Sequence, residues 1–221
     1  MKLVTLDDVK KNKEVITFLK TAERQLEVQG YTEHSFRHVG LVSKNAGAIL
    51  KAMDFDERSV ELAKIAGYLH DIGNAVNRVD HAHLGAVLAY NILTKMGMDV
   101  EEAAEIMLAI GHHDENTGTA VSNISAALIL ADKSDVHRSR VKNTDFATFD
   151  IHDRVNYAVE KSVISVNKEN KTVVLELIID TKICPVIDYF EIFLDRMTMN
   201  RRAADFLGLT FQLIVNGSQL L

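Results

Sequence analysis

The sequence contains almost no cysteine or proline. Cys184 is the only cysteine among 221 residues, which excludes an intramolecular disulfide and any zinc site built from several thiolates. We therefore expect a reducing, cytoplasmic location. Pro185 is the only proline, so the rest of the chain lacks the residue that most strongly breaks helices. This composition favours long helices.

An excess of positive charge and long apolar runs are also missing. Lys and Arg number 25 against 31 Asp and Glu, a formal net charge of −6. No global positive field is available to hold a nucleic acid or an anionic membrane, and we expect neither as a partner. No apolar run reaches the roughly 18 residues of a membrane span, and residues 1–14 lack a signal-peptide pattern. Any phosphate that the protein binds must be met by local charges.

What the sequence does contain is the pattern of a globular protein built mainly from helices. Hydrophobic residues make up 47% of the chain and charged residues 25%, enough for a real core. Apolar residues recur at three- and four-residue steps through much of the N-terminal part, which indicates amphipathic helices. We expect a bundle of six, at about residues 6–28, 32–53, 56–69, 80–96, 99–113 and 124–131.

The pattern changes after residue 143. A further helix is expected over residues 150–161, and the β-branched stretches 162–167 and 172–179 alternate with a period of two around a polar turn, which predicts a hairpin. Pro185 and Gly208 bracket another helix, and residues 209–215 alternate as a candidate third strand. We expect residues 145–221 to form a small α/β appendage packed on the helical domain of residues 1–144.

Histidine is abundant, and its placement indicates a metal site. Seven of the nine histidines lie between His34 and His113. His34 and His38 share a helix face, His70 and Asp71 end an apolar helix, and Asp132 ends an apolar run. Neither His70 nor Asp71 would be buried unless it were paired or coordinated a metal, and the carboxylate of Asp132 needs a partner of opposite charge, for which a metal ion is the simplest. Nitrogen and oxygen donors without sulfur, with this share of histidine, favour Fe, Mn, Co or Ni over Mg alone.

These residues resemble a known family. His38, the adjacent His70-Asp71 and the distant Asp132 are similar, over about residues 20–140, to the H…HD…D signature of HD-domain metal-dependent phosphohydrolases. The resemblance implies a mainly α fold, an HD-domain helical bundle followed here by the α/β appendage. It also implies a phosphohydrolase that cleaves a phosphoester or phosphoanhydride of a nucleotide or related small phosphate through a metal-activated bridging water.

The further histidines resemble those of the two-metal branches, which include HD-type diadenosine tetraphosphate hydrolases and HD-GYP phosphodiesterases. The Gly-Tyr-Pro motif is absent from residues 114–125, so we do not assign the cyclic-di-GMP activity. The resemblance implies two divalent ions with Asp71 between them. One ion would be held by His38, His70, Asp71 and Asp132, and the other by His83, His112 and His113. The alternative for His112 is a position next to the ligands without contact to the metal. His34 is a candidate extra ligand.

Other residues receive roles around this centre. Asp71, His70 and Asp135 are the candidate catalytic residues. Asp135 lies one turn after Asp132 and would orient the attacking water or a histidine ligand. The alternative for Asp135 is a solvated position on the helix surface. Lys133, Arg37 and Arg138 are candidate phosphate-binding residues, with the surface as the alternative for each. Many family members have lysine where this chain has Asn74, so no substrate transfers directly. No patterned partner is evident for the remaining histidines, which we expect at the surface or lining a substrate pocket: His81, His137 and His152.

Two other functions stay open at the level of sequence. A branch of the same superfamily uses a similar ligand set for a mixed-valent di-iron oxygenase. Alternatively, the metal stabilises a binding module, with the strands of the appendage as the interface of a candidate homodimer.

Overall fold

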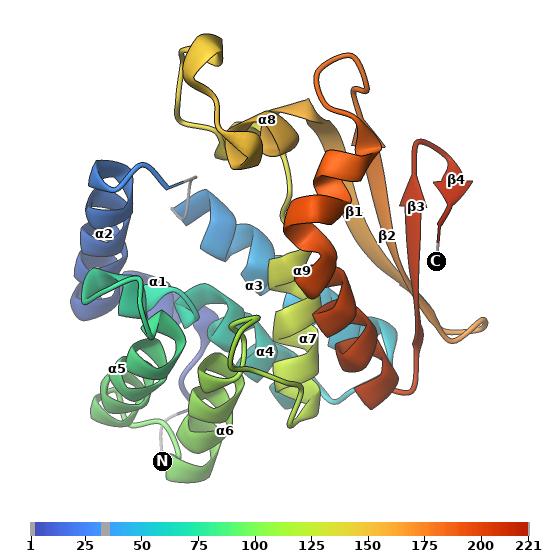
Figure 1. Cartoon of the computed structure of the whole chain (residues 1–221). Helices are drawn as coiled ribbons and strands as arrows, with labels where there is room; N and C mark the ends of the chain where they lie inside the picture. Colours follow the sequence, from blue (N-terminus) through green and yellow to red (C-terminus); the bar gives the residue numbers. More distant parts are fainter. Residues whose placement is uncertain (1–2, 32–35, 221) are drawn as a thin grey trace.

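The computed structural model of the chain describes residues 3–31 and 36–220 (Figure 1). The candidate ligand His34 lies outside the described residues. The expected mainly α fold is confirmed, with a helical bundle and a small sheet at one side (Figure 1). The bundle consists of α1 (Leu6–Lys11), α2 (Lys13–Val28), α3 (Phe36–Ala52), α4 (Glu57–Leu69), the short turn η1 (Ile72–Ala75), α5 (His81–Lys95), α6 (Val100–Gly111) and α7 (Asn123–Lys133).

The first predicted helix is in fact two. Asn12 ends α1 and caps α2, because its side-chain oxygen accepts the backbone N–H groups of Glu14 and Val15. Thr5 and Asp8 form a capping box at the start of α1. The apolar spacing continues across this break, which is why periodicity alone joins the two helices.

Helix α7 lies at the centre of the molecule. Every residue from Ile124 to Lys133 is buried, as expected for its nearly continuous apolar run. The helix packs against α3 and α4 on one side and against α9 of the C-terminal part on another (Figure 1). Asp132 and Lys133 are therefore charged residues fixed at the end of the most buried helix.

The turn η1 brings the end of α4 against the beginning of α5. At Gly73 a Cβ atom would overlap the carbonyl oxygen of His81, so only glycine permits this approach of the two backbones. A second close approach occurs at Gly67, where a Cβ would lie 2.8 Å from backbone atoms of Ser43 on α3. These contacts fix the ends of α3, α4 and α5 around one point.

The C-terminal part contains the predicted hairpin, helix and third strand. After the short turns η2 (Arg138–Arg140) and η3 (Phe146–Thr148), its elements are α8 (Ile151–Ala158), β1 (Val159–Asn167), β2 (Thr172–Ile179), α9 (Val186–Phe206), β3 (Thr210–Val215) and β4 (Ser218–Gln219). The strand order is β1-β2-β3-β4, antiparallel except for the parallel pair β2 and β3, which α9 connects as a crossover. Helix α8 ends before residue 161, because the chain already enters β1 at Val159, and β4 was not predicted.

One hydrophobic core runs through both parts. Tyr189, Phe193 and Met197 of α9 are buried in the same cluster as the residues of α7. Helix α9 therefore lies against the wall of the bundle that carries Asp132. Among the described residues, no helix is both long and apolar enough to cross a membrane.

Candidate metal centre

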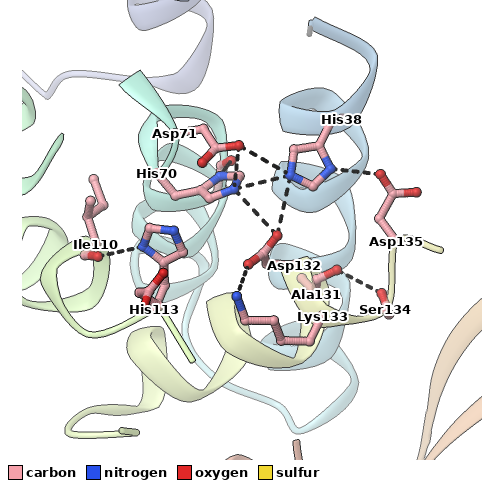
Figure 2. Close-up of polar contacts among 12 residues, drawn as sticks. His38, His70, Asp71, Ile110, His113, Ala131, Asp132, Lys133, Ser134 and Asp135 are labelled. Carbon is pink, nitrogen blue, oxygen red and sulfur yellow. Dashed lines mark hydrogen bonds and ion pairs between the residues drawn. The ribbon is translucent and has the colours of Figure 1, made fainter. Parts of the chain in front are cut away.

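The signature residues converge at the ends of three helices (Figure 2). His38 lies in the first turn of α3, His70 and Asp71 follow α4, and Asp132 is near the end of α7. The Nε2 atoms of His38 and His70 are 3.2 Å apart, and Asp132 Oδ1 lies 3.3 Å from the first and 3.5 Å from the second. All four residues are buried.

The two oxygens of Asp71 face different histidines. Its Oδ2 lies 3.4 Å from His70 Nε2 and 3.6 Å from His38 Nε2, whereas its Oδ1 lies 3.7 Å from His81 Nε2. Asn74 donates its side-chain amide to Asp71 Oδ1 at 2.9 Å and thereby orients the carboxylate. Asp71 is thus positioned between two sets of candidate ligands.

His81 and His113 form the second set. Their Nε2 atoms are 3.2 Å apart, and both side chains are buried. Their other ring nitrogens, Nδ1, are bound to backbone carbonyl oxygens, of Arg78 at 3.1 Å for His81 and of Ile110 at 2.7 Å for His113. Because a carbonyl can only accept, each Nδ1 carries the proton and each Nε2 presents a lone pair.

This arrangement fits metal ions. Two lone pairs 3.2 Å apart repel each other unless a cation lies between them, and atoms that bind one ion at about 2.1 Å lie roughly 3.0–3.5 Å from one another. His70 shows the same orientation, with Nδ1 bound to Gly67 O at 2.9 Å. Within the described part of the chain, three overlapping groups could hold an ion: His38, His70 and Asp71; His70, His113 and Asp132; and Asp71, His81 and His113.

His38 is hydrogen-bonded to a carboxylate through Nδ1, whereas His70, His81 and His113 are hydrogen-bonded to backbone carbonyls through theirs. The Nδ1 of His38 donates to Asp135 Oδ2 at 2.7 Å, and the same carboxylate accepts from Arg37 Nη2 at 2.9 Å and lies 3.8 Å from Arg140 Nε. Burial raises the pKa of Asp135, but Arg140, His38 and Arg37 together hold it far below its usual range. Burial and Arg140 lower the pKa of His38, yet its hydrogen bonds with Asp132 and Asp135 outweigh them and raise it.

His81 and His113 are held neutral instead. Burial is the main cause for both; it lowers the pKa of His81, and it lowers that of His113 to about 3 with help from His70 and Lys133. A neutral imidazole is the form that binds a metal. These two side chains are therefore ready to act as ligands throughout the physiological pH range.

The histidine predicted on α5 is the wrong one of two. The structure brings His81 to the centre and leaves His83 with a 56% exposed side chain, 3.8 Å from Asp80. Residues two apart on a helix point to nearly opposite sides, so only one of the pair can face the centre. His112, the other questioned ligand, is half-buried at the C-cap of α6 and belongs to none of the three groups.

The sequence did contain a signal for His81. His81 is in register with the small buried residues Gly85 and Ala89, whereas His83 is in register with Val87, which is 58% exposed. Because Val87 is itself apolar, the two faces of α5 are difficult to distinguish from sequence.

The predicted phosphate-binding cations lie in different places. Lys133 is buried, with Nζ 2.8 Å from Asp132 Oδ2 (Figure 2). Arg37 is bound to Asp135, and Arg138 to Glu160 at 3.0 Å at the surface. His137 and His152 also lie away from the centre.

A small cavity of about 20 Å³ adjoins the metal centre, with room for little more than one water molecule. Three residues that line it were not predicted from the sequence: Arg78, Glu115 and Arg196. Arg196 lies on α9, and no spacing in the sequence relates it to the signature. Beside this cavity, and sharing Arg78 and His81 with it, lies a groove of about 330 Å³.

Known proteins are similar to this chain in the same region. The model of the HD domain family matches residues 31–139, which contain the whole metal centre. An uncharacterised protein of Methanocaldococcus jannaschii is 29% identical to this chain over an alignment that covers 80% of this chain and 76% of the length of that protein. A crystal structure of a predicted HD superfamily hydrolase from an uncultured Thermotogales bacterium is 30% identical, covering 57% of this chain and 68% of its own with a TM-score of 0.44. Residues 31–139 of the chain therefore belong to the HD domain family.

Proposed function

We propose that this protein is a metal-dependent phosphohydrolase that cleaves a phosphoester or phosphoanhydride bond of a nucleotide or related small phosphate. The observation that carries the proposal is the placement of Asp71, whose two oxygens face separate sets of histidine Nε2 atoms. His38, His70 and Asp132 would hold one divalent ion and His81 and His113 the other, with Asp71 shared between them.

Two such ions would supply an activated water and neutralise charge on the reacting phosphoryl group. The side chains of this chain hold and orient the centre. His70, His81 and His113 are fixed by hydrogen bonds to backbone carbonyls, and His38 by a carboxylate. With His38 and two arginines around its carboxylate, Asp135 is a positioning residue for His38 rather than a base for the water.

The substrate would lie in the groove beside the centre. The groove's volume of about 330 Å³ is at the small end of ligand pockets, which suits a small molecule rather than a polymer. Arg78 lies at the junction of groove and cavity, where it can meet a phosphate. We propose a small phosphate compound as substrate, acted on in the cytoplasm without a nucleic-acid or membrane partner. A homodimer formed through the strands of the C-terminal part stays a prediction from the sequence.

The test is hydrolysis by metal-loaded protein. Protein purified without metal and reloaded with Mn, Fe, Co or Ni should release phosphate or a nucleotide from a panel of nucleotides and generic phosphodiesters. His70→Ala should abolish turnover, and His152→Ala, which changes an exposed histidine outside the groove, should leave it intact. Protein that retains two ions but hydrolyses nothing in the panel would contradict the proposal. Oxygen uptake by iron-loaded protein would favour the oxygenase instead.

A further inference from the structure

Glu115 closes one side of the cavity beside the metal centre. It lies in the loop between α6 and α7, and its two oxygens bind two different cations. Oε1 accepts from Arg196 Nε at 2.7 Å, and Oε2 lies 2.9 Å from Lys133 Nζ. Burial raises the pKa of Glu115, but Lys133 and Arg196 outweigh it and hold the pKa at about 2, so the carboxylate stays charged.

The two cations are fixed more firmly than the carboxylate between them. Lys133 is buried on α7, and Arg196 lies on α9 with its guanidinium 4.4 Å from the ring centre of Phe193. Glu115 lies on a loop whose neighbours Asp114 and Asn116 line the groove. The carboxylate is therefore the member of the trio that can be displaced without disturbing a helix.

The contacts of Glu115 are those that a phosphate group would make. Distances of 2.7–2.9 Å from cationic nitrogens are typical of charge-assisted bonds to carboxylate and phosphate alike. Lys133 also contacts Asp132 Oδ2, so the space that Glu115 occupies lies directly beside a metal-ligating residue. A cavity of about 20 Å³ cannot admit a phosphate while Glu115 remains in place.

We propose that Lys133 and Arg196 form a phosphate subsite next to the metal centre, which Glu115 occupies until a phosphate group of the substrate displaces it. The inference rests on the proposed function and narrows its substrate class. With the reacting phosphoryl group at the metals, the subsite would take the next phosphate along, so the preferred substrate carries at least two adjacent phosphate groups. The C-terminal part thereby contributes a binding residue, Arg196, to the HD domain.

Binding of inorganic pyrophosphate to the metal-loaded full-length protein, measured by calorimetry, tests the subsite without requiring turnover. Glu115→Gln removes the competing charge and should tighten binding about tenfold, comparable to one charge-assisted hydrogen bond. Adding Arg196→Gln should abolish that gain, whereas adding Arg201→Gln, an exposed arginine of the same helix, should not. For each variant, the metal content is measured before and after the titration, and a thermal melt checks that the protein is folded. Glu115→Ala replaces Glu115→Gln if the latter does not fold.

A general effect of charge is separated by Asp195→Asn, which removes an exposed carboxylate next to Arg196 on α9 and should change affinity less than about twofold. The inference is overturned if Glu115→Gln leaves affinity unchanged or weakens it, if Asp195→Asn gives the same gain, or if the gain survives Arg196→Gln. The proposed function fails separately. If the variants bind pyrophosphate as expected but the protein cleaves no phosphoester, the subsite is supported and the hydrolase proposal is refuted. If the protein is an active hydrolase but the variants do not show the expected binding, the subsite is refuted and the hydrolase proposal stands.

Discussion

The two halves of the proposed two-metal centre are held by different hydrogen-bond partners. In the His38 half, formed by His38, His70 and Asp132, the Nδ1 atom of His38 binds the carboxylate of Asp135, which two arginines hold in turn. In the His81 half, formed by His81 and His113, both Nδ1 atoms bind backbone carbonyls. A carboxylate makes its histidine a more basic ligand than a carbonyl does, at the cost of competition from protons. The comparison indicates that the His38 half would bind its ion with more electrostatic stabilisation. The His81 half would bind its ion through neutral imidazoles, with less competition from protons.

Removing Asp71 should break both halves at once and have the largest effect. Because its two oxygens face both halves, Asp71→Ala should lower metal content below one ion per chain and reduce hydrolysis by about a thousandfold, the loss of several kcal/mol of charge stabilisation. Elemental analysis and phosphate release measure the two effects. Asp195→Asn, which changes an exposed carboxylate of α9, serves as the control, and a variant that keeps two ions without Asp71 would refute the bridging role.

Changing Asp135 should remove the difference between the halves. Asp135→Asn keeps the size of the side chain but withdraws the charge from His38, so the His38 half should bind its ion about 10–100-fold more weakly while the His81 half is unchanged. Competition with a chelator, followed as two separate release steps, reports each half. Equal weakening of both steps, with an unchanged thermal melt, would show that Asp135 does not distinguish them.

The smallest predicted effect is on stability and concerns Glu115, which lines the cavity beside the proposed metal centre. The pKa of Glu115 is about 2 in the folded protein, below its ordinary value of 4.5, so its contribution to stability is present above pH 4.5 and is lost as pH falls toward 2. This contribution is at most about 3 kcal/mol. Glu115→Gln should therefore be less stable than the parent at pH 6, and the gap in the free energy of unfolding should narrow by pH 3. Urea titrations at both pH values measure it, and a gap independent of pH would contradict the ion-pair account.

The sequence predicts the His38 half well, because its members follow an ordered signature at the ends of apolar helices. It predicts the His81 half less well. His81 and His83 differ by two positions on α5, and the choice between them depends on how η1 packs against that helix at Gly73, a tertiary contact.

Similar limits apply to the fold. The bundle, hairpin, α9 and third strand follow from periodicity, whereas the break at Asn12 depends on a single cap and β4 is only two residues long. The contribution of Arg196 to the cavity depends on α9 packing against α7, which joins residues far apart in the chain. Local patterns contain no information on such contacts.

The most direct test of the two-metal account is the metal content of two matched histidine variants of α5. The parent protein and His83→Ala should each contain two ions per chain, and His81→Ala should contain one, retained by the His38 half. Loss of an ion from His83→Ala, with two ions kept in His81→Ala, would contradict the account.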